Sequence, residues 1–222
     1  MPAPRMRIGI FGDSAAGQEL AAGLAAAGHA LVRIDALTDI GEGEALILAI
    51  HATQLPRAVE AVETYIANGQ IVIHTALATG VQVLDPLETR GAVVVAAAPV
   101  SVNRWAVTTL DELGETIAGL LLGEMGVTAI AKTDAERATL ASRVAYAKML
   151  ARLTANARRE VELLMDEETQ PSADIDPAEV IDGYRYIHEP GLRRSYLEVA
   201  RRFGEVEEAE DIEMWALQEE NR

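Results

Sequence analysis

Short apolar runs alternate with Ala-rich or amphipathic stretches over the first 131 residues, and no other feature constrains the fold as strongly. Apolar runs of strand length, separated by segments of helix length, are typical of repeated βα units and a parallel sheet. We expect strands at residues 7–11, 30–35, 45–50, 70–75, 92–97, 106–108 and 128–131, and helices at 16–27, 55–67, 81–89 and 110–125.

Beyond residue 133 the strand-like runs stop. From Asp134 to Met165 apolar residues recur at helical spacing without Gly or Pro, which predicts one long helix. Asp176-Pro177 is typical of a helix cap followed by Pro at the first helical position. Further helices are expected at 178–187, 191–203 and 207–219. We therefore predict two domains, an α/β domain at 1–132 and a small all-helical domain at 133–222.

Composition excludes several classes of function. A formal net charge of −16 repels phosphate backbones and anionic lipid surfaces, so we expect neither nucleic acid nor membrane as a partner. The chain has no cysteine, and its four histidines lack the spacing of metal ligands, so no metal site is expected. No run of eighteen apolar residues occurs. We expect a soluble, cytoplasmic protein.

A glycine-containing turn joins the first expected strand to the first expected helix. It reads Gly12-Asp13-Ser14-Ala15-Ala16-Gly17, a Gly-x-Ser-x-x-Gly pattern. In a Rossmann-type domain the first Gly permits the tight turn, the last lets the helix pack closely, and the amides at the helix start attract a pyrophosphate. The pattern predicts a dinucleotide site formed by Gly12, Asp13, Ser14, Ala15 and Gly17, although Ser14 stands where the motif has its second Gly.

An acidic residue supports the same interpretation. Asp35 ends the second expected strand, 23 residues beyond Gly12, where a carboxylate accepts hydrogen bonds from the adenosine ribose. No Arg directly follows Asp35, so NAD is the expected cofactor and NADP the alternative. His51 follows the third expected strand at the same edge of the sheet and is a further candidate for cofactor binding.

A different class of site remains open at the same turn. Gly12-Asp13-Ser14-Ala15-Ala16 is similar to the GDSAG segment of esterases that resemble hormone-sensitive lipase, in which Ser14 would be the nucleophile. Ala16 replaces the second Gly of that segment, and the turn follows the first strand rather than a middle one. An ordinary helix-capping turn is the third interpretation.

Farther along, the chain resembles the β-hydroxyacid dehydrogenase and 6-phosphogluconate dehydrogenase-like superfamily. The resemblance rests on Ala98-Pro99-Val100-Ser101, which is similar to the family's APVSGG segment, with Val102-Asn103 in place of the two glycines. It implies that Ser101 binds substrate. The strand ending in His74-Thr75 is similar to the strand ending in His-Thr-Ser of some relatives, and Thr75 is a second substrate-binding candidate.

The resemblance also implies a catalytic lysine. Dehydrogenases of this superfamily usually carry a Lys early in the first long helix and an Asn four residues later. Lys148 lies in the expected long helix, but residue 152 is Arg and the next Asn is Asn156. Lys148 is therefore the catalytic candidate, with Tyr146 as an alternative acid.

The resemblance implies an NAD(P)-dependent oxidoreductase that transfers a hydride between the nicotinamide and a small hydroxy, keto or imino substrate. A homodimer through the C-terminal helices is expected, because about ninety residues are few to cover such a site. Two alternatives are a dinucleotide-binding protein without turnover, acting as a sensor or assembly partner, and an S-adenosylmethionine-dependent methyltransferase.

Overall fold

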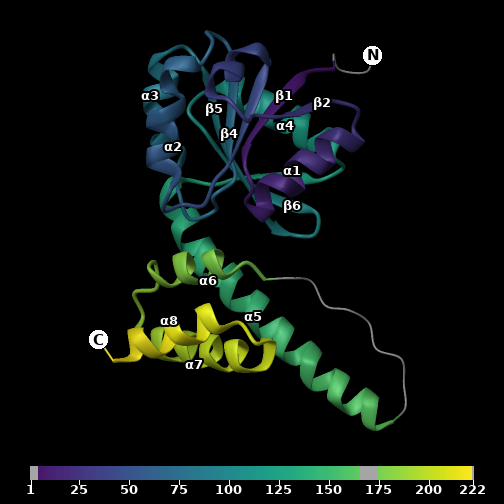
Figure 1. Cartoon of the computed structure of the whole chain (residues 1–222), viewed down its shortest axis with the longest axis vertical. Coiled ribbons are helices and arrows are strands. Elements are labelled where there is room, and N and C mark those ends of the chain that lie inside the picture. Colours follow the sequence, from purple (N-terminus) through teal and green to yellow (C-terminus); the bar gives the residue numbers. More distant parts are fainter. Residues whose placement is uncertain (1–4, 166–174, 222) are drawn as a thin grey trace. The chain divides into compact units, whose positions relative to one another are not determined.

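The computed structural model describes residues 5–165 and 175–221. The chain forms two compact units, Met1–Ala138 and Thr139–Arg222, each with its own hydrophobic core. The first unit holds a seven-stranded sheet in the order β2-β1-β3-β4-β5-β6-β7 (Figure 1). Its strands are β1 (Arg7–Gly12), β2 (Ala30–Arg33), β3 (Ala45–Ala49), β4 (Ile71–His74), β5 (Val93–Ser101), β6 (Arg104–Thr109) and β7 (Thr128–Ala131).

Five strands, β1 to β5, run parallel, and the other two run in the opposite direction. β6 pairs antiparallel with β5, and β7 pairs parallel with β6. Only Val102 and Asn103 join β5 to β6, and so short a connection forms a hairpin and cannot cross over to a parallel strand. The expected α/β sheet is thus confirmed as mostly parallel, with an antiparallel hairpin at one side.

Helices cover both faces of this sheet (Figure 1). The helices α1 (Ala15–Ala26) and α4 (Glu112–Glu124) pack on one face, and α2 (Leu55–Val62) and α3 (Asp85–Thr89) pack on the other. Successive residues of β3 alternate between two cores: Ile47 joins the α1 side, whereas Leu46 and Leu48 join the α2 side. All of β3 is buried, as expected of a parallel strand covered on both faces.

Two of the expected helices are partly 3-10 helices. The stretch 55–67 is helical only to Val62 and then continues as a 3-10 turn, Glu63–Tyr65. The stretch 81–89 begins as a 3-10 helix, Val81–Leu84, before α3 starts with Pro86 in its first turn. Proline fits there because the first amides of a helix need no partner within the helix.

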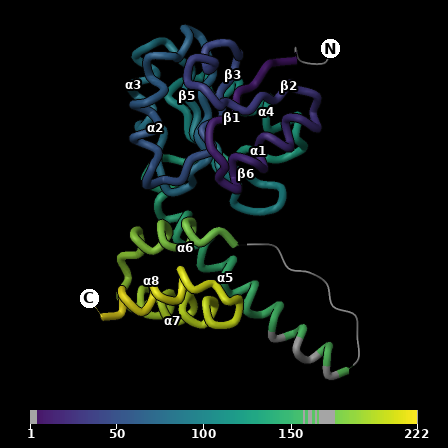
Figure 2. The backbone as a smooth tube through the Cα atoms, viewed as in Figure 1, coloured from purple at the N-terminus to yellow at the C-terminus, as the bar shows by residue number. Residues whose placement is uncertain are grey.

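The second unit is helical. The helix α5 (Asp134–Leu164) begins within the first unit and continues into the second, and α6 (Pro177–Tyr184), α7 (Pro190–Glu207) and α8 (Glu210–Glu220) follow (Figure 2). Asp176 caps α6 by accepting a bond from the Ala178 amide at 2.9 Å, as the sequence predicts. The stretch between α5 and α6, which is rich in polar residues and predicts a loop at 166–177, lies mostly outside the described residues.

Aromatic side chains lie in the core of the helical unit. Tyr196 is fully buried, stacks on Tyr146 with ring centroids 5.7 Å apart, and donates a hydrogen bond to the Val180 carbonyl. On α8, Ile212 and Ala216 are also fully buried in this core. The side of α8 that carries Ile212 and Ala216 therefore packs against its own unit.

Candidate functional site

Two glycines shape the turn between β1 and α1. Gly12 has φ +100°, and a Cβ atom there would lie 2.3 Å from the Ala49 carbonyl oxygen. A Cβ atom on Gly17 would lie 2.3 Å from the Ala49 Cβ. Both positions require glycine, because α1 starts directly against the end of β3.

Ser14 caps α1 and is buried. Its Oγ accepts a hydrogen bond from the Gly17 amide at 3.3 Å and lies 3.4 Å from the Thr75 Oγ1. Its own amide donates to the Ala49 carbonyl at 2.8 Å. The hydroxyl thus acts as a helix cap, which does not suit an exposed esterase nucleophile. The amides of Ala15 and Ala16 remain to face an anion at the helix start.

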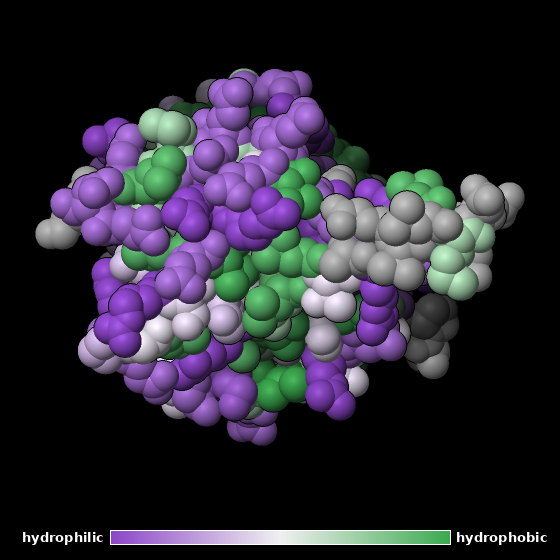
Figure 3. All heavy atoms as spheres, turned by 90° about the horizontal axis from the view of Figure 1, so that it is seen from below, coloured by the Kyte–Doolittle hydropathy of each residue, from purple (hydrophilic) through white to green (hydrophobic). Residues whose placement is uncertain are grey.

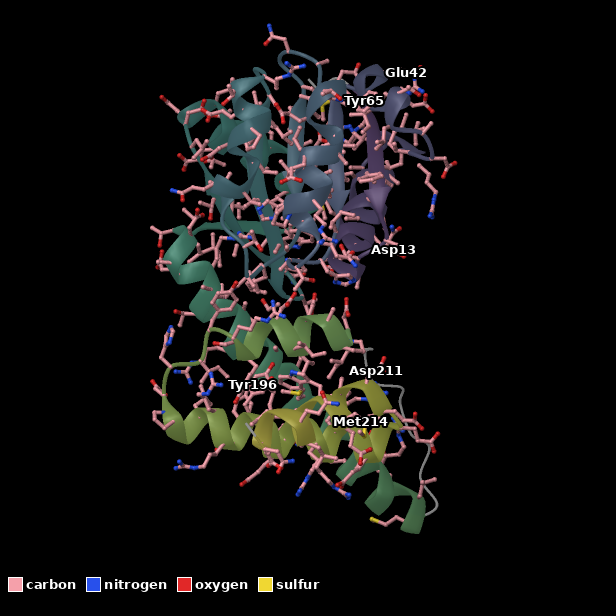
Figure 4. The ribbon with its side chains drawn as sticks, turned by 60° about the vertical axis from the view of Figure 1, so that its left-hand side comes forward. Asp13, Glu42, Tyr65, Tyr196, Asp211 and Met214 are labelled. Atoms are coloured by element: carbon pink, nitrogen blue, oxygen red, sulfur yellow. The ribbon has the colours of Figure 1, made fainter. Side chains whose placement is uncertain are left out.

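Asp13 is exposed in this turn, at one end of the first unit, whereas Glu42 and Tyr65 lie at its other end (Figure 4). The strand register explains this position. Gly12 pairs with Ala49, and both are the last residues of their strands. The turn therefore lies at the carboxyl edge of the parallel strands, where open α/β sheets bind ligands.

Asp35, the expected ribose acceptor, follows β2 and is exposed. Its Oδ1 lies 3.4 Å from the Nε of Arg33, whose side chain is also exposed. The sequence criterion for NADP was an arginine directly after Asp35. Arg33 precedes Asp35 in the chain, so that criterion overlooks it. The carboxylate and the guanidinium stand together on the adenosine side of the expected site.

His74 ends β4, Thr75 follows it, and the two side chains have different partners. Thr75 is 2% exposed and contacts Ser14. The fully buried His74 lies with its Nε2 3.1 Å from the Gly80 carbonyl. Burial, and then the charge of Arg137, lower the pKa of His74 to about 3, so its ring is neutral at neutral pH. His74 is therefore unsuited to act as a proton donor.

The two remaining candidates of this unit lie at different places. His51 is half-buried after β3, and its carbonyl accepts the amides of Gln54 and Leu55. Ser101 is exposed at the end of the β5–β6 hairpin. His74 pairs with Ala96 on β5, and Ala97 is the next residue. Ser101 lies four residues beyond Ala97, which is roughly 13 Å of extended chain. Ser101 is thus not gathered with Ser14 and Thr75.

Lys148 belongs to the helical unit and is ion-paired. Its Nζ lies 2.7 Å from a carboxylate oxygen of Glu179 on α6, and both side chains are partly exposed. One and two turns farther along α5, Arg152 and Asn156 both bond to Glu207 of α7. The arginine that replaces the family's Asn is thereby tied to a carboxylate, and its hydrogen bond lowers the pKa of Glu207.

Arg137 is a buried polar residue that was not predicted from the sequence. It is fully buried in the first turn of α5, and its guanidinium donates to four main-chain carbonyls. A signal was present: Arg137 precedes the buried residues Ala141, Ala145 and Met149 at intervals of four, so a charged residue occupies the apolar stripe of the helix.

Two negative findings concern the described residues alone. Within 5–165 and 175–221, no three His, Asp or Glu side chains gather as metal ligands. None of the helices in that part of the chain is both long enough and apolar enough to cross a bilayer.

Comparison with solved structures shows the same fold at low sequence identity. Arogenate dehydrogenase from Synechocystis is 14% identical, with a TM-score of 0.53, and the match covers 97% of this chain and 88% of that one. Plasmodium falciparum pyrroline carboxylate reductase with NADP bound is 9% identical, with a TM-score of 0.57 and 96% of each chain covered. Prephenate dehydrogenase from A. aeolicus, in complex with hydroxyphenyl propionate and NAD+, is 11% identical, with a TM-score of 0.52, covering 100% and 88%.

Two family models match separate parts of the chain. Residues 40–99 match a Rossmann-like domain, and residues 133–219 match the 6-phosphogluconate dehydrogenase C-terminal domain-like family. No curated protein sequence matches the chain. The resemblance seen in the sequence is thereby confirmed for these parts of the chain: residues 40–99 are similar to a Rossmann-like domain, and residues 133–219 to the 6-phosphogluconate dehydrogenase C-terminal domain-like family.

Proposed function

We propose that the protein is an NAD(P)-dependent oxidoreductase that acts on a small hydroxy, keto or imino substrate. The observation that carries this proposal is the Gly12–Gly17 turn, in which close packing on Ala49 presents the Ala15 and Ala16 amides at the carboxyl edge of the sheet. Such amides, with the dipole of α1, attract a pyrophosphate. The dehydrogenase and reductase names of the structural neighbours support the same class of reaction.

The proposed cofactor lies across the edge from β2 to β4. Asp35 binds the adenosine ribose, the turn with Gly12, Asp13, Ser14, Ala15 and Gly17 holds the pyrophosphate, and the nicotinamide half extends over β3 and β4 toward His51 and Thr75. The strand order β2-β1-β3-β4 supports this direction, because the switch point between β1 and β3 lies at the turn. NAD remains the proposed cofactor, and Arg33 beside Asp35 is the group that would accept the extra phosphate of NADP.

Thr75 after β4 and Ser101 on the β5–β6 hairpin are proposed as separate substrate contacts of the first unit. A nicotinamide supplies hydride chemistry when bound. The protein's own task is to orient the substrate and to exchange a proton with its oxygen or nitrogen. Lys148 is the proposed proton donor, and the Glu179 carboxylate, 2.7 Å away, fixes the direction of its side chain. The active protein is proposed to be a homodimer.

The helical unit offers the surface for that dimer. Its exposed apolar side chains include Leu150 and Leu163 on α5, Met165, and Met214 on α8. Seen from below, the molecule shows hydrophobic surface near the middle of the view and hydrophilic residues around it (Figure 3). Sedimentation equilibrium of the protein and of Leu150→Asp tests this: a dimer that the substitution weakens supports the proposal, and a monomeric parent protein contradicts it.

The first test is a fluorescence-detected titration with NADH and NADPH, run in parallel on Gly12→Val. The parent protein should bind at least one nucleotide, and the variant should bind neither, because the valine side chain meets the Ala49 carbonyl and Ile50. Binding by the parent justifies a screen of hydroxy acids, keto acids and imines. Absence of binding to both nucleotides would contradict the proposal.

One observation favours a second candidate, a dinucleotide-binding protein without turnover. Arg152 stands where the family's dehydrogenases usually carry Asn, and it is engaged with Glu207. NADH binding without oxidation of the nucleotide across the substrate screen would support this sensor role. Turnover that Lys148→Met abolishes would instead support the oxidoreductase.

A further inference from the structure

A buried arginine holds the chain segment that follows β4. Arg137 donates hydrogen bonds from Nε to the Thr79 carbonyl at 2.9 Å and from Nη2 to the Ala76 carbonyl at 3.1 Å. Its Nη1 bonds to the carbonyls of Ala96 on β5 and Ala106 on β6, at 3.2 and 3.0 Å. One guanidinium therefore ties the segment 75–80 to two strands of the sheet.

Two further side chains hold the same segment. His74 lies with its Nε2 3.1 Å from the Gly80 carbonyl, and the Asp134 Oδ1 accepts a bond from the Val81 amide at 2.9 Å. Asp134 and Arg137 both belong to the first turn of α5, inside the first compact unit. The segment 75–80 is thus held near its start and at its end by side chains of β4 and α5.

The electrostatics show what the arginine provides. Burial lowers the pKa of Arg137 to about 10, and the charge of Asp134 opposes this shift, so the guanidinium stays protonated at neutral pH. Burying a cation among neutral carbonyls costs free energy, which an apolar side chain would avoid. What only arginine supplies here is a planar set of donors that reaches four carbonyls at once.

We propose that Arg137 is a positioning residue for the nicotinamide half of the cofactor site. The inference rests on the proposed function. Asp35 after β2 marks the adenosine side, and β4 lies on the other side of the turn at Ser14, so the segment 75–80 borders the nicotinamide. Arg137 keeps this segment, and Thr75 at its start, in the position that the nicotinamide meets.

The experiment compares NADH with ADP-ribose, which lacks the nicotinamide. Calorimetric titrations measure both affinities for the parent protein, for Arg137→Lys and for Arg143→Lys, a control at a partly exposed arginine of the same helix. For Arg137→Lys we expect NADH affinity to fall on the order of tenfold while ADP-ribose affinity changes less than about twofold. The enhanced fluorescence of bound NADH should fall as well.

A second variant keeps the test valid if Arg137→Lys does not fold. Asp134→Ala leaves the arginine in place and removes the bond to Val81. It should also weaken NADH more than ADP-ribose, by a smaller factor. Equal losses for the two ligands would show a general structural role and overturn the inference, as would unchanged affinity for NADH.

Failure of the proposed function has a different signature. In that case the parent protein binds neither NADH nor ADP-ribose, and the inference falls with it. Binding of both ligands by the parent protein, with no selective effect in either variant, overturns the role of Arg137 alone.

Discussion

The two units place their candidate residues by different physical means. In the Rossmann-like unit, Gly12, Ser14 and Thr75 are fixed by backbone geometry and by buried contacts with neighbouring strands. In the helical unit, Lys148 is placed by an ion pair between two partly exposed side chains. Backbone-determined positions tolerate few residue types, whereas exposed ion pairs contribute little and are easily exchanged. The first unit therefore supports the stronger functional argument.

Two cations of α5 give the sharpest form of this comparison. Arg137→Met leaves up to four buried carbonyls without their donor, and we expect the free energy of unfolding to fall by at least about 3 kcal/mol. Lys148→Met breaks one exposed pair, and its effect should stay within about 1 kcal/mol. Denaturant unfolding measures both. Similar losses in the two variants would remove the contrast between the units.

The dependence of the free energy of unfolding on pH tests the burial of His74 at the end of β4. His74 has a folded-state pKa of about 3, below its ordinary value of 6.5, so the unfolded chain binds a proton that the folded protein excludes. Stability should therefore fall as the pH drops below 6.5, by up to about tenfold in the unfolding equilibrium per pH unit. His74→Gln should flatten this dependence between pH 6.5 and 5.5, above the ordinary pKa of 4.5 around which glutamates of the unfolded chain titrate.

The measurement is urea unfolding at several pH values. If the free energy of unfolding of His74→Gln fell with pH as steeply as that of the parent protein, His74 would not be excluded from protonation as described.

The glycines provide a smaller and local contrast. Gly17→Ala places a Cβ against Ala49 and should cost about 1–3 kcal/mol, because neither backbone has room to move freely. Gly119→Ala on α4 is the control, since nothing lies within 4 Å of its Cβ position, and it should stabilise the helix by about 0.5–1 kcal/mol. Thermal unfolding distinguishes them. Equal effects would contradict the close packing of α1.

The smallest expected effect concerns the choice of cofactor. Arg33→Ala removes the cation beside Asp35 without touching the core, and both side chains are exposed. We expect the affinity for NADPH to fall by a few-fold, equivalent to about 1 kcal/mol or less, while that for NADH changes little. Competitive titration measures the ratio of the two affinities. A larger loss for NADH would place Arg33 elsewhere in the site.

The elements predicted from the sequence were those with a periodic pattern. All seven strands and the long helix were predicted. A central strand such as β3, buried on both faces, reads as a continuous apolar run, and α5 lacks Gly and Pro. The opposite direction of β6 was not, although the two residues between β5 and β6 allow only a hairpin.

The candidate site was predictable only where the backbone determines it. Gly12 and Gly17 belong to a motif that predicts a tight turn and a closely packed helix, and the structure has both. Arg137 was missed because its partners are carbonyls of segments far away in the sequence, which have no residue signature. The hairpin position of Ser101 was likewise hidden, since APVS alone does not specify how far its strand extends.

The most direct test of the dinucleotide site is an NMR titration that follows every backbone amide as NAD+ is added. We expect the largest shifts at residues 12–17, above all at the Ala15 and Ala16 amides, with further shifts at 75–80. Glu42 and Tyr65, at the other end of the unit, should change little. Absence of shifts at residues 12–17, or shifts concentrated around Glu42 and Tyr65, would contradict a dinucleotide site at this turn.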